Sequence, residues 1–196
     1  MLIVINRRQP KPKNMIRYIL TFALFSLITS ATSAQTHSKV DYDAFEKLVA
    51  EVKPHRAERL LNVERFGSLS KQIDVIILDT RSKAMYDAKH IKDAIHLNFS
   101  DFTQKALENL IPSKETKILI YCNNNFDEDE EYFPTKSFTP PTPNPNKLTE
   151  LTLALNIPTY INLYGYGYRN VYELSELISV HDGRIKLEGT AVPKGY

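Results

Sequence analysis

The stretch DVIILDTRSKAMYDAKHIKDAIHL, residues 74–97, carries the pattern that decides the fold. It opens with the apolar, β-branched run 74–79 and closes with the shorter run 94–97, and both are typical of strands that are buried on two faces. Between them, a short helix is expected near Ser82 to Asp87. Two buried strands joined by a helical crossover are typical of a parallel sheet.

Two further apolar runs extend this pattern along the chain. Residues 117–121 (KILIY) and 170–174 (NVYEL) are also expected to be strands. Strands that alternate with helices predict an α/β fold of three layers, in which helices cover both faces of a central, mostly parallel sheet. The remaining helices are expected at 42–52, where Pro54 ends the pattern, at 56–63, at 100–110 with Ser100 as the cap, and after Pro158 with Asn156 as the cap.

One long segment, from Asn123 to about Asn156, does not follow this alternation. It begins with the five acids 127–131, contains five prolines between 134 and 145, and regains an apolar pattern only afterwards. Because proline has no N–H and a fixed φ, neither a strand nor a helix is expected across 134–145. Loops of this length are uncommon in compact domains, so the segment is either a flap over a functional site or a disordered insertion.

The first 34 residues have the composition of a secretory signal peptide. Five basic residues and no acid accompany an apolar run of roughly Ile16 to Ile28, and small residues follow up to Ala34. This run is shorter than the about 20 residues that span a bilayer, so cleavage near Ala34 is expected rather than a stable membrane anchor. Met15 is an alternative start of the signal peptide. The mature chain is therefore expected in the periplasm, with residues 39–196 as a single domain.

Removal of the signal peptide changes the charge balance. The whole chain has 25 basic and 23 acidic residues and a formal net charge of +2, and loss of five basic residues moves that charge to about −3. This balance argues against nucleic acid as a partner. The only cysteine, Cys122, cannot form an internal disulfide, so it is either a small buried residue or an exposed, reactive thiol.

Cys122 lies where a nucleophile is expected. It directly follows the predicted strand 117–121, and ligands of open α/β sheets bind at the carboxyl ends of the strands. We expect the thiol to be exposed at this edge, near backbone N–H groups of a tight loop that stabilise a thiolate or an anionic adduct. The amino end of the helix after Pro158 is expected to point at Cys122 and to favour the same anion.

Three stretches resemble the rhodanese, or sulfurtransferase, domain in their order and spacing. The first lies within 74–97 and is similar to the family's Asp-x-Arg signature, followed by an aromatic residue, His-Ile and Ala-Ile. It is carried here by Asp79, Arg81, Tyr86, His90, Ile91, Ala94 and Ile95. The second, ILIYC at 118–122, looks like the strand that delivers the family's catalytic cysteine. The third, GYGYRNVYEL at 165–174, resembles the stretch that leads into the family's last core strand.

The resemblance implies a rhodanese-like fold and sulfur-transfer chemistry without a cofactor or a metal. Cys122 would accept a sulfane sulfur as a persulfide from a small donor such as thiosulfate or a polysulfide. It would pass this sulfur to a thiol, a cyanide-like acceptor or a protein acceptor. Asp79 and Arg81 are expected to form a structural ion pair, and His90 to be a structural histidine. The anion cradle would be the backbone of the loop after the cysteine: Asn123, Asn124, Asn125, Phe126 and Asp127.

This loop departs from the family's pattern. The family has a short, glycine-containing loop with an arginine about five residues after the cysteine, and Asp127 occupies that place here. Because a carboxylate disfavours a nearby thiolate, the acids 127–131 are expected to face solvent. Lys136, Lys147 and Arg169 are candidates for the missing cation. A catalytically weak or inactive module, which binds a partner or senses oxidants, is therefore the alternative function.

Three other kinds of site fit the sequence less well. A cysteine phosphatase needs an arginine in the loop that follows the cysteine, and residues 123–127 contain none. A calcium loop that begins at Asn123 lacks glycine at its sixth position and has Pro134 where a bidentate glutamate belongs. A zinc site built from His90, His96 and the cysteine has no ligand pair at a recognised spacing.

Overall fold

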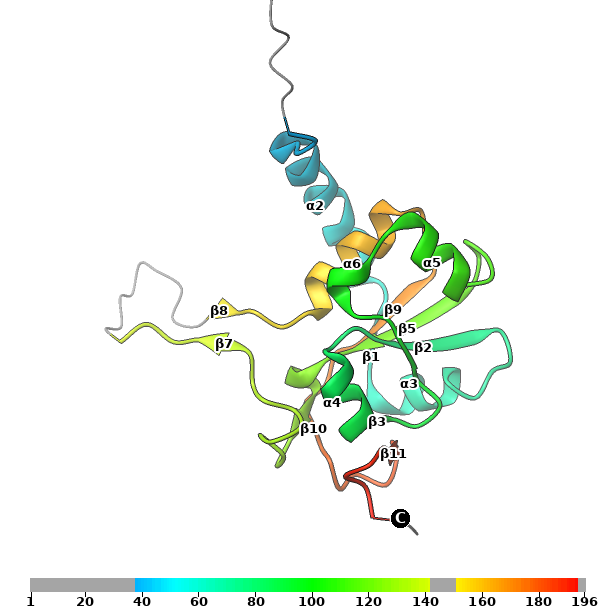
Figure 1. Cartoon of the computed structure of the whole chain (residues 1–196), viewed down its shortest axis with the longest axis vertical. Helices are drawn as coiled ribbons and strands as arrows, with labels where there is room; N and C mark the ends of the chain where they lie inside the picture. The colour runs from blue at the N-terminus through cyan, green and yellow to red at the C-terminus, as the bar shows by residue number, and fades with distance from the viewer. Residues whose placement is uncertain (1–37, 142–150, 194–196) are drawn as a thin grey trace, which may run out of the picture. The chain divides into compact units, whose positions relative to one another are not determined.

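Five strands form the central sheet of the computed structural model, which describes residues 38–141 and 151–193 (Figure 1). Their order across the sheet is β1-β9-β5-β2-β4, and every neighbouring pair is parallel. The strands predicted at 74–79, 94–97, 117–121 and 170–174 are confirmed. In chain order the five are β1 (Leu60–Leu61), β2 (Val75–Asp79), β4 (Ile95–His96), β5 (Lys117–Tyr121) and β9 (Val171–Leu174).

Helices and three small strand pairs surround this sheet in the described part of the chain. The helices are α2 (Tyr42–Ala57), α3 (Val63–Leu69), α4 (Lys83–Ala88), α5 (Gln104–Leu110) and α6 (Asn156–Gly165), with the 3-10 turns η1 (Phe99–Asp101) and η2 (Asn123–Asn125). The small pairs are the parallel β6 (Phe126–Asp127) and β10 (Ile178–Ser179), the antiparallel β3 (His90–Ile91) and β11 (Leu187–Glu188), and the antiparallel β7 (Ser137–Phe138) and β8 (Leu151–Thr152). None of the described helices is long and apolar enough to cross a membrane.

The chain divides into the units Met1–Val40 and Asp41–Tyr196, and all of these elements belong to the second unit. The predicted signal peptide, residues 1–34, lies outside the described residues, and so do residues 142–150 of the predicted insertion. Export of the protein therefore stays a prediction.

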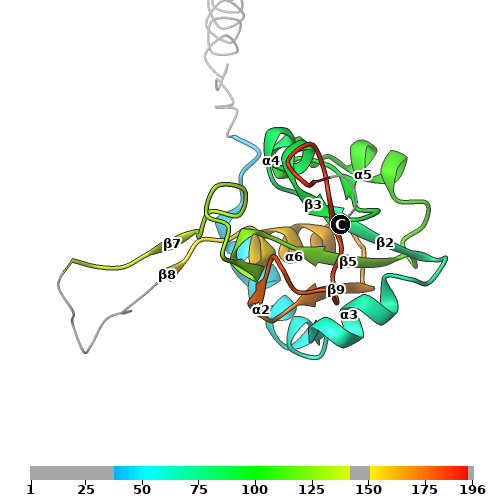
Figure 2. The ribbon, with the colours of Figure 1, turned by 90° about the horizontal axis from the view of Figure 1, so that it is seen from below.

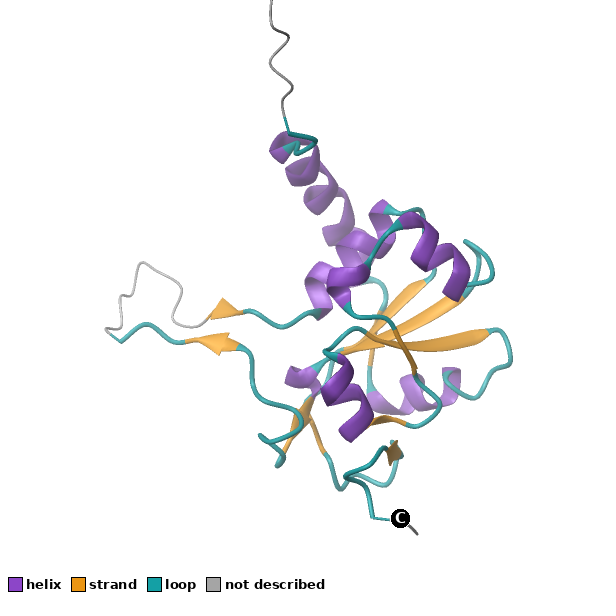
Figure 3. Cartoon of the chain, in the orientation of Figure 1, coloured by secondary structure: helices purple, strands orange, loops and turns teal. Residues whose placement is uncertain are grey.

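Helices lie on both faces of the sheet (Figure 3), and apolar side chains fill the space between the helices and the sheet. One core lies between the sheet and the helices α2, α5 and α6, and it includes Val52, Tyr160 and Ile120. The other core lies on the opposite face, where Phe66 of α3 packs with Leu119. Neighbouring residues of β5 thus face different cores, as successive strand residues do. Helices cover both faces, which confirms the predicted three-layer α/β fold.

Helix α2 runs past the proline that was expected to end it. Pro54 lies inside the helix, which continues beyond it. A proline inside a helix removes one backbone hydrogen bond, but side chains of the last turn bind the rest of the domain. His55 Nδ1 lies 2.9 Å from the Tyr160 hydroxyl, and Arg56 Nε donates to Glu173 at 2.5 Å. These contacts explain why the last turn stays helical.

Two other helix predictions were wrong in their placement. Residues 56–63 do not form one helix, because Leu60–Leu61 pair with β9 as an edge strand and bury Leu61. The next helix, α3, begins only at Val63. Helix α5 begins after Thr103 and not after Ser100. The Thr103 side chain caps the helix, since its hydroxyl oxygen accepts a hydrogen bond from the backbone N–H of Ala106.

The proline-rich segment contains a strand, contrary to the prediction. Strand β7 (Ser137–Phe138) pairs with β8 in an antiparallel hairpin. Its two residues lie between Pro134 and Pro140 and keep their backbone N–H groups. The prolines therefore limit the length of the strand but do not prevent it.

A buried ion pair closes the carboxyl edge of the sheet. Arg81 donates to Asp79 Oδ2 through Nε (3.1 Å) and Nη2 (2.7 Å), and both side chains are buried. Arg81 also donates from Nη2 to Lys89 O (2.7 Å) and from Nη1 to Tyr132 O (3.1 Å). The Tyr121 hydroxyl donates to Asp79 Oδ2 at 2.5 Å. Burial opposes the arginine charge, but the bonds and the charge of Asp79 outweigh it and raise the pKa of Arg81.

We predict that Asp79→Ala destabilises the domain by about 3–5 kcal/mol, because it leaves the Arg81 charge buried without its partner. The matched control is Lys83→Gln, which breaks the solvent-exposed pair with Asp87 and should cost less than about 0.5 kcal/mol. Urea unfolding of the wild type and both variants measures the difference. Equal effects of the two substitutions would contradict a central role for the buried pair.

Candidate active site

Cys122 directly follows β5 and precedes the η2 turn, at the carboxyl edge of the sheet. Its side chain lies on the same face as Ile118 and Ile120, which α6 covers. The residue is only 1% exposed. The expectation of an exposed thiol was therefore wrong, because the η2 turn and the start of α6 close over the end of the strand.

Three backbone N–H groups lie near the Cys122 sulfur and lower the pKa of its thiol. They belong to Asn124 in η2 and to Leu155 and Asn156 at the start of α6. The amino end of α6 therefore points at the cysteine, as predicted, and its dipole favours negative charge there. The N-cap residue of α6 is Leu155, so the predicted cap at Asn156 was wrong by one position. The Asn156 side chain is used instead in hydrogen bonds to other parts of the site.

Burial dominates the acidity of the thiol. Loss of solvent raises the pKa of Cys122 from its ordinary 9.0 to about 11, because a thiolate is poorly stabilised away from water. The N–H groups of Asn124, Asn156 and Leu155 lower this pKa, but less than burial raises it, and the charge of Glu173 raises it further. At neutral pH, therefore, the thiol is almost entirely protonated.

A chain of hydrogen bonds joins the backbone of Cys122 to a second ion pair. Cys122 N donates to Asn125 Oδ1 (3.0 Å), and Asn156 Nδ2 donates to the same oxygen (3.1 Å) and to Glu173 Oε1 (3.1 Å). Arg56 of α2 binds both Glu173 oxygens at 2.5 Å. Arg56 and Glu173 are 117 positions apart in the chain. No local pattern in the sequence indicates such a pair, so neither residue was predicted.

The three asparagines after Cys122 hold the turn in different ways. Asn124 directs its N–H to the sulfur. Asn125 Nδ2 donates to Leu174 O (2.8 Å) and to Glu176 O (3.2 Å), and this amide fixes the turn to the end of β9. Asn123 is buried, and its Oδ1 has no hydrogen-bond partner among the described residues. Of the five predicted cradle residues, Asn124 thus contributes the N–H that faces the sulfur.

The other two predicted cradle residues, Phe126 and Asp127, form β6 and face elsewhere. Phe126 is buried in the core on the opposite face of the sheet, with its ring centroid 4.3 Å from that of Phe133. The acidic run mostly faces solvent, as expected. Within it, Asp129 is half-buried and accepts from Lys89 Nζ at 2.6 Å. The exposed members are Asp127, Glu128, Glu130 and Glu131.

The residues predicted to support the site contact protein groups at the edge of the sheet. Asp79 and Arg81 form the buried ion pair described above. His90 of β3 stacks on Tyr86 with ring centroids 3.9 Å apart. Its Nδ1 lies 2.6 Å from Tyr86 O, and its Nε2 lies 3.3 Å from the Glu188 carboxylate. These contacts of His90 tie β3 to α4 and β11.

The candidate cations lie in different places. Lys136 is exposed, and it binds the η2 turn through its backbone, since its N–H donates to Asn124 Oδ1 at 2.8 Å. Lys147 lies outside the described residues. Arg169 lies over the Tyr164 ring, 3.5 Å from its centroid, just before β9 begins. Because the strands are parallel, Arg169 is at the edge of the sheet opposite to the cysteine.

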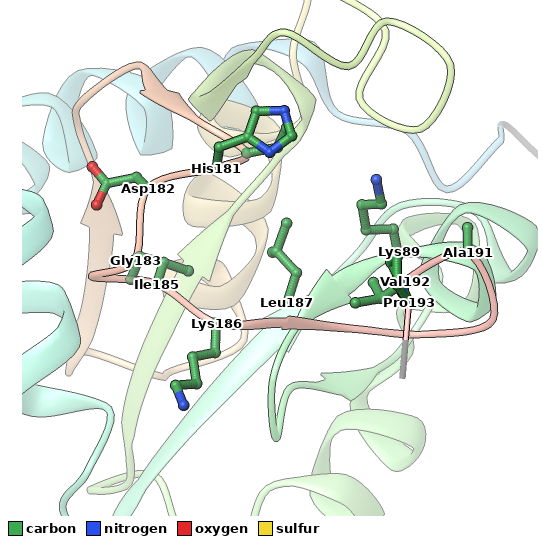
Figure 4. A pocket seen from close by; sticks show the side chains of 11 residues that line it. Lys89, His181, Asp182, Gly183, Ile185, Lys186, Leu187, Ala191, Val192 and Pro193 are labelled. Carbon is green, nitrogen blue, oxygen red and sulfur yellow. The ribbon is translucent and has the colours of Figure 1, made fainter. Parts of the chain in front are cut away.

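A cavity of about 420 Å³ lies beside the segment 180–193 (Figure 4). It is lined by Lys89 and by parts of the segment 180–193, including Ile185 and Leu187. No residue of the η2 turn or of α6 lines it, so this cavity is separate from the thiol. Within 38–141 and 151–193, no group of three His, Cys, Asp or Glu side chains is placed to hold a metal ion.

We predict that Glu173→Gln lowers the pKa of Cys122 below about 11, because it removes the carboxylate charge that opposes the thiolate. The pH dependence of alkylation by iodoacetamide, measured on the folded protein, reports this pKa. Glu115→Gln is the control, since Glu115 is exposed and precedes β5 at the other end of the strand. An unchanged midpoint in Glu173→Gln would show that the carboxylate does not act on the sulfur.

A family model described as Rhodanese-like domain matches residues 62–139, a range that includes β2, β5 and Cys122 and ends before α6. The comparison with curated proteins found no match.

The solved structures that are similar to the chain include the following three. One is the BH2092 protein from Bacillus halodurans, with 18% identity, 76% of this chain and 86% of that chain covered, and a TM-score of 0.45. Another is the Alr3790 protein from Anabaena sp., with 20% identity, 66% of this chain and 80% of that chain covered, and a TM-score of 0.42. The third is the rhodanese-like domain of the Alr3790 protein, with 16% identity, coverage of 70% and 86%, and a TM-score of 0.40. Over residues 62–139, therefore, the chain matches the rhodanese-like domain family.

Proposed function

We propose that this domain is a sulfurtransferase in which Cys122 accepts a sulfane sulfur and passes it on from a persulfide. The observation that carries the proposal is the convergence of three backbone N–H groups on the Cys122 sulfur, from η2 and from the start of α6. Donors placed in this way stabilise an anion without a charged side chain. The thiolate and the persulfide are the anions that the reaction needs at this position.

The proposed reaction has two displacement steps. After the thiol proton is lost to solvent, the Cys122 thiolate attacks the outer sulfur of thiosulfate. A new S–S bond forms, the S–S bond of thiosulfate breaks, and sulfite leaves with the bonding electron pair. Cyanide or an acceptor thiolate then attacks the outer sulfur of the persulfide, and the Cys122 thiolate leaves. Neither a cofactor nor a metal takes part in this scheme.

A catalytically weak module, which binds a partner or senses oxidants, is the second candidate function. The burial of Cys122 and its pKa of about 11 favour this candidate, because reactive cysteines are accessible and have a low pKa. For either function, export to the periplasm through residues 1–34 is a prediction from the sequence.

We predict that the folded protein gains one sulfur atom when it is incubated with thiosulfate or a polysulfide. Intact mass before and after incubation measures the gain, and cyanide should remove it as thiocyanate. Cys122→Ser is the control and should gain nothing, because the protein has no other cysteine. If the wild type gains no sulfur from any donor, sulfur transfer is excluded and the second candidate stands.

We also predict that the rate of persulfide formation rises about tenfold for each pH unit between pH 7 and 10. The rate is expected to rise with pH because the pKa of Cys122 is raised. At a pH below about 11 the reactive thiolate is the minor form, and its fraction grows as the pH increases. The urea-unfolded protein is the control, since its thiol should titrate near the ordinary 9.0 and its rate should level off above that pH. A plateau below pH 9 in the folded protein would contradict the prediction.

A further inference from the structure

The β7–β8 hairpin and the start of α6 expose four apolar side chains. Figures 1 and 2 show the hairpin standing away from the central sheet. Phe138 and Leu151 are opposite each other in the strand pair, and Leu153, two residues further on, lies on the same face. Ile157 follows in the first turn of α6. We call these four residues the hairpin surface; they are 54% (Phe138), 42% (Leu151), 59% (Leu153) and 46% (Ile157) exposed.

The hairpin surface is connected at both ends to the groups that hold the cysteine. At its first end, Asn124 binds the backbone of Lys136 twice, through Oδ1 to the N–H (2.8 Å) and through Nδ2 to the carbonyl (3.0 Å). At its other end, Leu155 and Asn156 direct their N–H groups to the sulfur, and Ile157 is the next residue. A molecule that binds the hairpin surface therefore contacts the start of α6 and a hairpin that is hydrogen-bonded to the η2 turn.

Negative charge accompanies this apolar surface. The acids 127–131 lie in the chain between the η2 turn and the hairpin, and four of them are exposed. The Glu130 carboxylate accepts from Thr135 N (3.0 Å) and from Thr135 Oγ1 (2.6 Å), which holds its charge at the start of the hairpin. Such a surface repels small anions and attracts a basic partner. Exposed apolar side chains next to charged ones are typical of a protein-binding site.

We propose that the hairpin surface docks a protein whose contact surface is basic and apolar, and which carries the thiol that takes sulfur from Cys122. This proposal names a protein acceptor for the sulfur transfer proposed above, and it rests on that function. Burial of the thiol fits this role, because an acceptor that binds here contacts the hairpin and the start of α6, which adjoin the groups that cover the sulfur. The acidic run then selects the partner by charge, and the apolar side chains supply contact area.

Sulfur transfer to two model peptides tests the proposal. The protein is first loaded with sulfur from a polysulfide. It is then mixed with one of two cysteine peptides of equal length. In the basic peptide, leucines and lysines flank the cysteine, and in the acidic peptide, leucines and glutamates flank it. We expect transfer to the basic peptide to be at least about tenfold faster at low salt, and this preference to shrink as salt is added. Transfer to cyanide measures the intrinsic reactivity of the persulfide.

Variants of the surface give the matched comparison. Phe138→Ser/Leu153→Ser should slow transfer to the basic peptide about tenfold and leave transfer to cyanide unchanged. Ile73→Ser is the control, because Ile73 is also exposed but precedes β2 at the opposite edge of the sheet, and it should change neither rate.

The outcomes separate this inference from the function on which it rests. If the protein loads and cyanide unloads it, but both peptides react at the same rate, the docking surface is wrong while sulfur transfer stands. If the protein does not load, both fail. Dimerisation in light scattering that Phe138→Ser/Leu153→Ser abolishes would make the surface a contact between copies of this chain and would also overturn the proposal.

Discussion

The buried pair of Asp79 and Arg81 is the interaction on which the placement of the site depends. Through Tyr121 and two carbonyl groups, it joins the ends of β2 and β5 to the end of α4 and to the acidic loop. Cys122 is the residue after Tyr121, so the position of the thiol is fixed from one side by this pair. A buried charge pair is costly to form, and here its geometry is supported by hydrogen bonds to nearly every donor of the guanidinium group. The loops at this edge can vary in length while the strand ends stay in place.

Two opposing effects meet at the sulfur. Three N–H groups and the start of a helix favour an anion, whereas burial and the Glu173 carboxylate disfavour it. In the described conformation, burial raises the pKa of the thiol more than the N–H groups lower it, so the thiol is protonated at neutral pH. The pair of Arg56 and Glu173 lies at the end of the hydrogen-bond chain that starts at the Cys122 backbone. A change in that pair would alter both the charge near the sulfur and the position of the turn.

Much of the fold could be predicted from the sequence, and the environment of the thiol could not. The long strands and the place of Cys122 follow from local patterns of apolar residues, which have a period set by the backbone. The helix that runs through Pro54 and the edge strand Leu60–Leu61 depend on contacts with β9 and α6, far away in the chain. Burial of the thiol has the same origin, because the start of α6 comes more than thirty residues after Cys122. The acids were predicted to face solvent from their charge alone, whereas the role of Asn125 depends on partners near Leu174.

The strands at both edges of the central sheet, β1 and β4, have only two residues each, and so do the strands of the β7–β8 hairpin. A strand this short leaves few unpaired backbone groups, so it is a poor template for another extended chain. The described part of the domain is thereby protected against edge-to-edge aggregation. The same property limits how a partner can be recognised: addition of a strand to an edge would gain few hydrogen bonds, and specificity has to come from side chains.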